Sequence, residues 1–157
     1  MKVKIKKISK KAVIPAYATA GDAGMDLTAV SMKIDKFGNI VYGTGLAFEI
    51  PEGYVGLVFP RSSNHKKGII LTNCIGVIDS GYRGEVTLKF RPLLNRASEY
   101  YDDGSFDYAN RTLRMTYKVG DRIGQIIIMP YPHIEFEEVE ELSETERGTK
   151  GYGSSGE

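Results

Sequence analysis

The spacing of glycine is the feature that most limits how this chain can fold. Between residues 21 and 84 glycines recur at short intervals, and the segments they separate are short and rich in alternating or β-branched apolar residues. Glycines at this spacing mark turns between strands, and no segment shows the longer periodicity of a helix. We therefore predict an all-β domain, either a distorted jelly roll or a barrel-like sandwich.

The strands themselves are predicted from alternation and β-branching. They cover residues 2–8, 32–35, 40–42, 45–50, 54–59, 69–71, 76–78, 85–90, 113–117 and 123–129, with a last strand containing Phe136 and Val139. Residues 32–35 and 40–42 form a predicted hairpin, and a turn at 51–53 joins 45–50 to 54–59. One helical turn is expected after Pro60, with a serine as its N-cap.

Length and composition exclude several classes of protein. The 157 residues fit one domain, predicted over residues 1–142, followed by a flexible Gly/Ser-rich C-terminal arm over 143–157. A net charge of +1 argues against a generic nucleic-acid binder. A single cysteine and two histidines leave no disulfide framework or Cys-rich zinc site. No apolar run approaches the ~20 residues of a membrane span, and the basic N-terminus lacks a secretory core, so we expect a cytoplasmic protein.

Five segments carry residues suited to phosphate chemistry. An aspartate lies between apolar residues at 23–27, and Arg61 with two serines follows a strand at 60–63. Asp79 ends an apolar strand within 76–84, where it suits a base that activates water. An acid, a base and an amide precede the apolar strand at 120–125, and the arm offers glycines, hydroxyls and cations. Taken singly, each segment also reads as a turn, a helix cap, an ion pair or a linker.

Together and in this order, the five segments resemble the five motifs of the trimeric dUTPases. They read Ala-Gly-Met-Asp-Leu at 23–27, Pro-Arg-Ser-Ser at 60–63, Gly-Val-Ile-Asp-Ser-Gly-Tyr-Arg-Gly at 76–84, Gly-Asp-Arg-Ile-Gly-Gln at 120–125, and an Arg-Gly to Gly-Tyr-Gly-Ser-Ser-Gly arm from residue 147. The resemblance implies a jelly-roll homotrimer with three active sites at subunit boundaries. It further implies hydrolysis of dUTP to dUMP and pyrophosphate with Mg²⁺, which keeps uracil out of DNA and supplies dUMP for thymidylate synthesis.

The same resemblance implies a role for each matching residue. Asp79 would orient the attacking water, and Tyr82 would lie under the deoxyribose and exclude a 2′-hydroxyl. Asn73 and the backbone of a 73–82 hairpin, including Gly76 and Ile78, would read the uracil edge. The phosphates would be held by Arg61, Ser62, Ser63, Gln125, Arg147, Gly153, Ser154 and Ser155, while Tyr152 would stack on the base. Asp26 and Asp121 would be supporting residues, and Mg²⁺ would be held mainly by substrate phosphates and water rather than by the protein.

Two alternatives stay open at this point. The first is an enzyme resembling dCTP deaminase, which shares the fold. The second is a regulatory binding module on the same fold. A polar, tyrosine-rich excursion over residues 95–112 could also dock an unidentified protein partner on an active enzyme.

Overall fold

The computed structural model describes residues 1–93 and 116–151, and over these ranges the protein is an all-β fold. The strands are β1 (Lys4–Lys7), β2 (Met25–Thr28), β3 (Ser31–Ile34), β4 (Ile40–Gly43), β5 (Leu46–Glu49), β6 (Tyr54–Pro60), β7 (Ile69–Leu71), β8 (Gly76–Ile78), β9 (Thr87–Pro92) and β10 (Arg122–Pro130). A short 3₁₀ helix, η1 (Ser62–Lys67), follows β6. The all-β prediction is confirmed.

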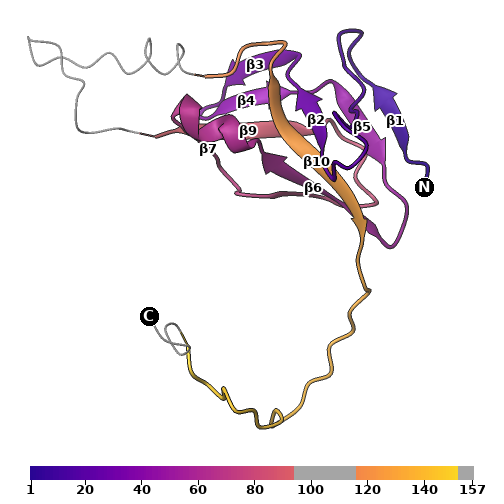
Figure 1. Ribbon diagram of the computed structural model, residues 1–157, viewed down its shortest axis with the longest axis vertical. Helices are drawn as coiled ribbons and strands as arrows, with labels where there is room; N and C mark the ends of the chain where they lie inside the picture. Colours follow the sequence, from indigo (N-terminus) through magenta and orange to yellow (C-terminus); the bar gives the residue numbers. More distant parts are fainter. Residues whose placement is uncertain (94–115, 152–157) are drawn as a thin grey trace, which may run out of the picture.

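The strands form three antiparallel sheets, with orders β1-β5, β2-β10-β6-β8 and β3-β4-β9-β7 (Figure 1). The central strand of the second sheet, β10, pairs with β6 from Gly124 opposite Pro60 to Pro130 opposite Tyr54. It also pairs with β2 on its other edge, where Gln125 lies opposite Asp26. Segments that are almost a hundred residues apart in sequence therefore meet on adjacent strands.

The core lies between the two four-stranded sheets, and aromatic rings fill its centre. Tyr42 on β4 and Phe90 on β9 are fully buried, and Tyr117 packs edge-on against Tyr42 with ring centroids 6.2 Å apart. The Tyr42 hydroxyl donates a hydrogen bond to the Tyr117 carbonyl at 2.7 Å. Burial raises the pKa of the Tyr42 phenol, partly offset by a hydrogen bond with Thr116. Burial in the folded core therefore favours the neutral form of the Tyr42 hydroxyl.

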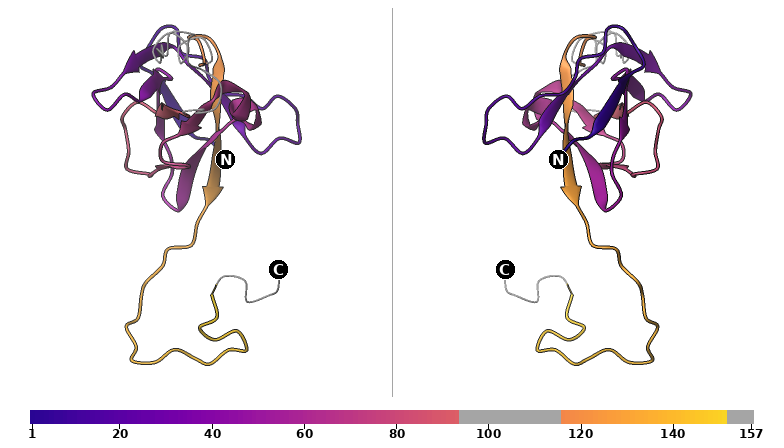
Figure 2. Two further views of the ribbon diagram at one scale, coloured as in Figure 1. Left: turned by 90° about the vertical axis from the view of Figure 1, so that its left-hand side faces the viewer. Right: turned by 90° about the vertical axis from the view of Figure 1, so that its right-hand side faces the viewer.

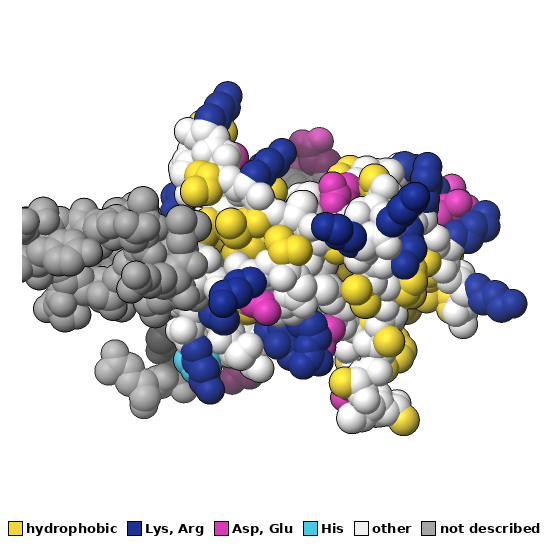
Figure 3. Space-filling model, turned by 90° about the horizontal axis from the view of Figure 1, so that it is seen from above, with side chains coloured by type: hydrophobic (Ala, Val, Ile, Leu, Met, Phe, Trp, Pro, Cys, Tyr) yellow, Lys and Arg dark blue, Asp and Glu magenta, His cyan; other side chains and the backbone are white. Residues whose placement is uncertain are grey.

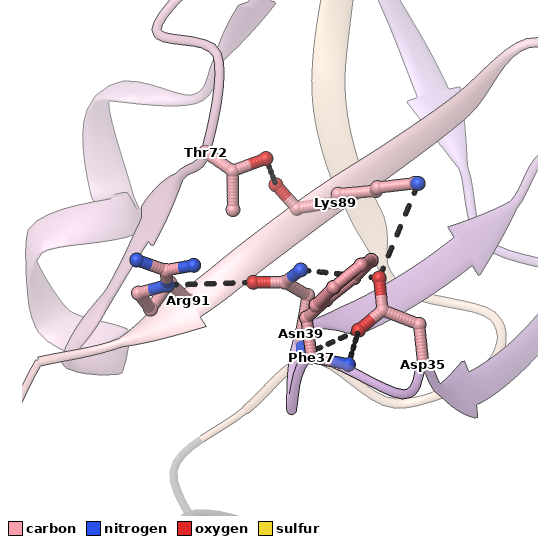
Figure 4. Close-up of polar contacts among 6 residues, drawn as sticks. All are labelled: Asp35, Phe37, Asn39, Thr72, Lys89 and Arg91. Carbon is pink, nitrogen blue, oxygen red and sulfur yellow. Dashed lines mark hydrogen bonds and ion pairs between the residues drawn. The ribbon is translucent and has the colours of Figure 1, made fainter.

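The predicted hairpin is confirmed as β3 and β4, which pair from Ser31 opposite Gly43 to Ile34 opposite Ile40. Its turn is organised by Asp35, whose carboxylate accepts the backbone N–H groups of Phe37 and Asn39 at 2.9 and 3.0 Å (Figure 4). The hydrogen bond from the Asn39 side chain is the main cause that lowers the pKa of Asp35. Gly38 has φ +77°, a left-handed conformation that glycine adopts without strain.

The same turn is linked to β9, the neighbour of β4. Lys89 reaches the Asp35 carboxylate at 4.0 Å, and Arg91 donates to the Asn39 side-chain oxygen at 3.4 Å (Figure 4). Lys89 in turn accepts, at its carbonyl, a bond from the Thr72 hydroxyl at 3.2 Å. These contacts fasten the hairpin end to the sheet, and none of their residues is a predicted site residue.

Several local predictions are wrong in detail. The strand predicted at 85–90 runs instead from Thr87 to Pro92, since proline is tolerated at a strand end where the next residue, Leu93, donates to Gly68. The helical turn after Pro60 is confirmed, but its N-cap is Arg61 with no side-chain cap rather than a serine. The predicted strand at 113–117 falls largely outside the described residues, and Tyr117 itself is not in a strand.

The chain leaves the sheets after β10 (Figures 1 and 2). All residues from 131 to 151 are exposed, and the predicted strand at Phe136 and Val139 is wrong. Phe136 is 93% exposed, so this stretch contacts no sheet of its own chain that could pair with it. Apolar residues are present, but a strand also needs a neighbouring backbone to bond.

The face seen in Figure 3 carries both positive and negative charges, because basic and acidic side chains are interspersed there with apolar ones. This mixture agrees with the nearly balanced charge of the sequence. Within residues 1–93 and 116–151, no helix is long and apolar enough to cross a membrane.

Candidate active site

One group of predicted site residues meets where β2, β10 and β6 lie side by side. Gln125 on β10 is opposite Asp26 on β2 and opposite Phe59 on β6, and Arg61 follows directly where β6 ends. Strand pairing thus brings three of the five predicted segments to one end of one sheet. The sequence alone gives each segment but not this register.

Asp26 is the centre of that group. Its Oδ1 accepts from Arg61 Nε at 3.1 Å, and its Oδ2 accepts from Arg122 Nη1 at 3.0 Å. Only 15% of the Asp26 side chain is exposed, so the carboxylate holds both guanidinium groups in a partly desolvated setting. The supporting role predicted for Asp26 fits this geometry. Arg122 had no predicted role, although its place at the start of an apolar strand beside Asp121 was the available signal.

Gln125 and Ser63 lie close to this cluster. A Cβ placed on Gly24 would lie 3.4 Å from the Gln125 Cβ, an ordinary van der Waals contact, so Gly24 packs beside the Gln125 side chain. Burial raises the pKa of the Tyr117 phenol, and the nearby Ser63 hydroxyl and Arg61 partly counter that rise. The ammonium group of Lys67 lies 5.2 Å from the centre of the Tyr117 ring. Tyr117, which the sequence did not single out for the site, therefore supports the turn that carries Ser62 and Ser63.

Asp121 lies in the turn that precedes β10. Its side chain accepts the backbone N–H of Lys118 at 2.8 Å, and its carbonyl accepts from Ala29 at 2.9 Å. It closes the turn that leads into β10. This geometry fits the supporting role that the resemblance implies for Asp121, and it also fits an ordinary turn residue.

A second group lies on and after β8, the strand on the other edge of β6. Gly76 pairs with Val58 and Ile78 with Gly56. The side-chain nitrogen of Asn73 lies 3.7 Å from the position that a Cβ on Gly76 would occupy. Asn73 is exposed and Ile78 is half-buried. The predicted 73–82 hairpin is wrong as a pairing, because β8 pairs with β6 and residues 79–82 form a turn instead.

Asp79 begins that turn. Its side chain is exposed, and its carbonyl accepts the Tyr82 N–H at 3.1 Å. Arg83 Nη1 donates to the carbonyls of Ser80 and Tyr82 at 2.5 and 3.0 Å. The Tyr82 hydroxyl donates to the Glu85 carbonyl at 3.0 Å, and 44% of Tyr82 is exposed. The turn is thus preorganised, with its carboxylate open to solvent.

The two groups are separated along the sheet. Because β8 runs antiparallel to β6, Asp79 lies near Gly56, whereas Arg61 lies five positions further along. At ~3.3 Å per strand residue, that separation is roughly 16 Å. The backbones of Asp79 and Arg61 in one chain are therefore well separated along the sheet.

The arm residues lie away from both groups in the views of Figures 1 and 2. Arg147 Nε donates to the Lys150 carbonyl at 3.2 Å, and the Gly148 N–H donates to the Thr145 carbonyl at 3.0 Å. These are contacts of the arm with itself. Four predicted arm residues, Tyr152, Gly153, Ser154 and Ser155, lie outside the described residues, as does the 95–112 excursion.

The donor set bears on how a metal could be held. Among the described residues no three His, Cys, Asp or Glu side chains group together in a way that could hold an ion. Asp26 is engaged by two arginines, and Asp79 is a lone exposed carboxylate. The described residues therefore offer a divalent cation single carboxylates rather than a cluster.

Comparison with known proteins places this arrangement in context. The family model described as dUTPase matches residues 10–97 and 104–156. Deoxyuridine 5′-triphosphate nucleotidohydrolases from Nautilia profundicola and Finegoldia magna are 43% and 40% identical, each over 99% of both chains. The structure of the Staphylococcus bacteriophage 80alpha dUTPase with dUpNHpp matches with a TM-score of 0.74 and 29% identity, covering 99% of this chain and 98% of that one.

Proposed function

The chain belongs to the dUTPase family, and we propose that it hydrolyses dUTP to dUMP and pyrophosphate in a site completed by neighbouring copies of the chain. The observation that carries the second part is the separation within one chain. The backbones of Asp79 and Arg61 lie roughly 16 Å apart along the sheet, and the described part of the arm, through residue 151, lies away from both. In the homotrimer we propose, each site takes these parts from different copies.

The phosphate-binding part is the sheet end around Arg61. The triphosphate carries several negative charges, and Arg61 with the hydroxyls of Ser62 and Ser63 offers donors that match phosphate oxygens. Asp26 holds the Arg61 guanidinium in place while leaving its remaining N–H groups to bind. Gln125 adds a neutral donor on the adjacent strand. Preorganised donors of this kind stabilise charge that develops in the transition state.

The chemical step is assigned to Asp79. We propose that its carboxylate accepts a proton from a water and aims that water at the α-phosphorus, in line with the leaving pyrophosphate oxygen. Mg²⁺ bound to the phosphates would neutralise part of their charge. A structural Mg(II) ion is described for a mutant dUTPase of phage phi11 of S. aureus, which resembles this chain in fold with a TM-score of 0.68.

Specificity is assigned to the β8 end of the sheet. Asn73 and the backbone at Gly76 and Ile78 would read the uracil edge, because unpaired N–H and C=O groups of an edge strand can bond a planar base. Among the described residues β8 is the last strand of its sheet, and none of them pairs with its outer edge as a strand. Tyr82 would lie against the deoxyribose. The arm would then close, with Tyr152 on the base and Arg147, Gly153, Ser154 and Ser155 on the phosphates.

The experiment that tests the proposal measures pyrophosphate and ammonia released from dUTP, dTTP, dCTP and UTP with Mg²⁺. We expect pyrophosphate from dUTP alone. In Asp79→Asn, which keeps the shape of the side chain, turnover should fall by about 10³-fold or more while dUTP binding persists. Ammonia from dCTP would favour a deaminase, and near-normal turnover by Asp79→Asn would remove the carboxylate as the base.

A further inference from the structure

The backbone conformation at Gly84 is one that residues other than glycine can adopt. Its φ lies outside the left-handed region, unlike those of Gly38, Gly53 and Gly120. Space is the constraint instead. A Cβ at position 84 would lie 2.5 Å from Cζ and 2.9 Å from Cε2 of Tyr82, and would overlap the hydroxyl as well. The Tyr82 ring therefore lies across the bare Cα of Gly84.

The surrounding bonds leave little else that could move to admit a side chain. Before Gly84, Arg83 and the Tyr82 N–H tie the turn to the carbonyls of Ser80, Tyr82 and Asp79. After it, Glu85 accepts the Gly45 N–H at 2.7 Å through its side chain, and the Val86 N–H donates to Leu46 at 2.9 Å. With the backbone held on both sides, a Cβ at 84 is accommodated by rotating the Tyr82 ring.

We propose that Gly84 is a positioning residue that sets the Tyr82 ring at the angle needed to accept deoxyribose and reject ribose. This inference rests on the proposed function, in which Tyr82 faces the sugar. The Tyr82 hydroxyl donates to the Glu85 carbonyl, and the hydroxyl end of the ring occupies the space that a side chain on Gly84 would fill. A rotated ring would lose that hydrogen bond and open the volume that a 2′-hydroxyl needs.

Gly81 provides a matched control in the same turn. It also lies outside the left-handed region, and a Cβ there would meet nothing within 4 Å. Gly81→Ala and Gly84→Ala add the same methyl group three residues apart. Only the second is expected to displace the Tyr82 ring.

The test compares kcat/KM for dUTP and UTP in wild type, Gly84→Ala and Gly81→Ala. We expect the dUTP preference to fall by about tenfold or more in Gly84→Ala and to stay near wild type in Gly81→Ala. If wild type prefers dUTP over UTP and Gly84→Ala prefers it equally, the inference about Gly84 is overturned while the proposed function stands. A wild type that leaves dUTP intact would instead overturn the proposed function, and the inference with it.

A double-mutant cycle with Tyr82→Ala separates ring positioning from general damage to the fold. Without the ring there is nothing to displace, so Tyr82→Ala/Gly84→Ala should match Tyr82→Ala in both nucleotide preference and thermal midpoint. This holds even if Gly84→Ala alone fails to fold, because removing the ring should restore folding. Additive losses in the double variant would show that Gly84 acts independently of Tyr82, contrary to the proposal.

Discussion

The two ends of the β2-β10-β6-β8 sheet are held together in different ways. At the Arg61 end, Asp26 bonds residues 35 and 96 positions away in sequence, so the contacts join strands that only the complete fold brings together. At the Asp79 end, the side-chain bonds of the turn span three residues or fewer. The first end depends on the global fold, whereas the second is shaped by its own sequence.

Because the two ends are bonded differently, substitutions at each end should affect the stability of the fold and the choice of nucleotide to different extents. Residues at the Arg61 end hold strands together and, in the proposed function, also bind the phosphates, so changes there are expected to affect both folding and catalysis. Most side chains of the 79–84 turn are exposed and locally bonded, with Ser80 and Gly84 half-buried. Changes to the exposed side chains should therefore affect the choice of nucleotide or the rate with little loss of stability.

The largest contrast is expected between Asp26→Asn and Arg83→Ala. Asp26→Asn leaves two guanidinium groups side by side without their counter-charge, and unfolding free energy should fall by about 2 kcal/mol. Arg83→Ala removes bonds within an exposed turn and should cost less than about 1 kcal/mol. Urea unfolding of both variants measures the difference, and equal losses would show that the two ends are not distinct.

A smaller effect is expected from the buried phenols between the sheets. Burial raises the pKa of both Tyr42 and Tyr117 above that of the unfolded chain. The folded state therefore holds its phenolic protons longer, so stability should be full below about pH 10 and decline as pH rises above it. Tyr117→Phe should flatten this alkaline decline in urea midpoints measured from pH 8 to 11. An unchanged decline would mean that the Tyr117 phenol does not contribute to it.

The sequence predicts individual strands well where alternation is strong, as in residues 54–59 and 123–129, and it marks the turn that opens with Asp79. It does not predict the Asp26 cluster, because the register between β2, β6 and β10 depends on pairing between distant segments. Nor could it predict that Phe136 and Val139 lie outside any strand, since their apolar character says nothing of an available neighbour. The seat of the Tyr82 ring over Gly84 is likewise visible only in three dimensions.

Subunit mixing tests most directly the claim that neighbouring copies complete each site. Asp79→Asn and Arg61→Ala chains are each expected to be inactive, and they are unfolded together, refolded as a mixture and assayed with dUTP. If each site takes Asp79 from one copy and Arg61 from another, random mixing at equal amounts should restore roughly a quarter of wild-type activity. A mixture that stays as inactive as its components would show that one copy supplies both residues, and would contradict the account.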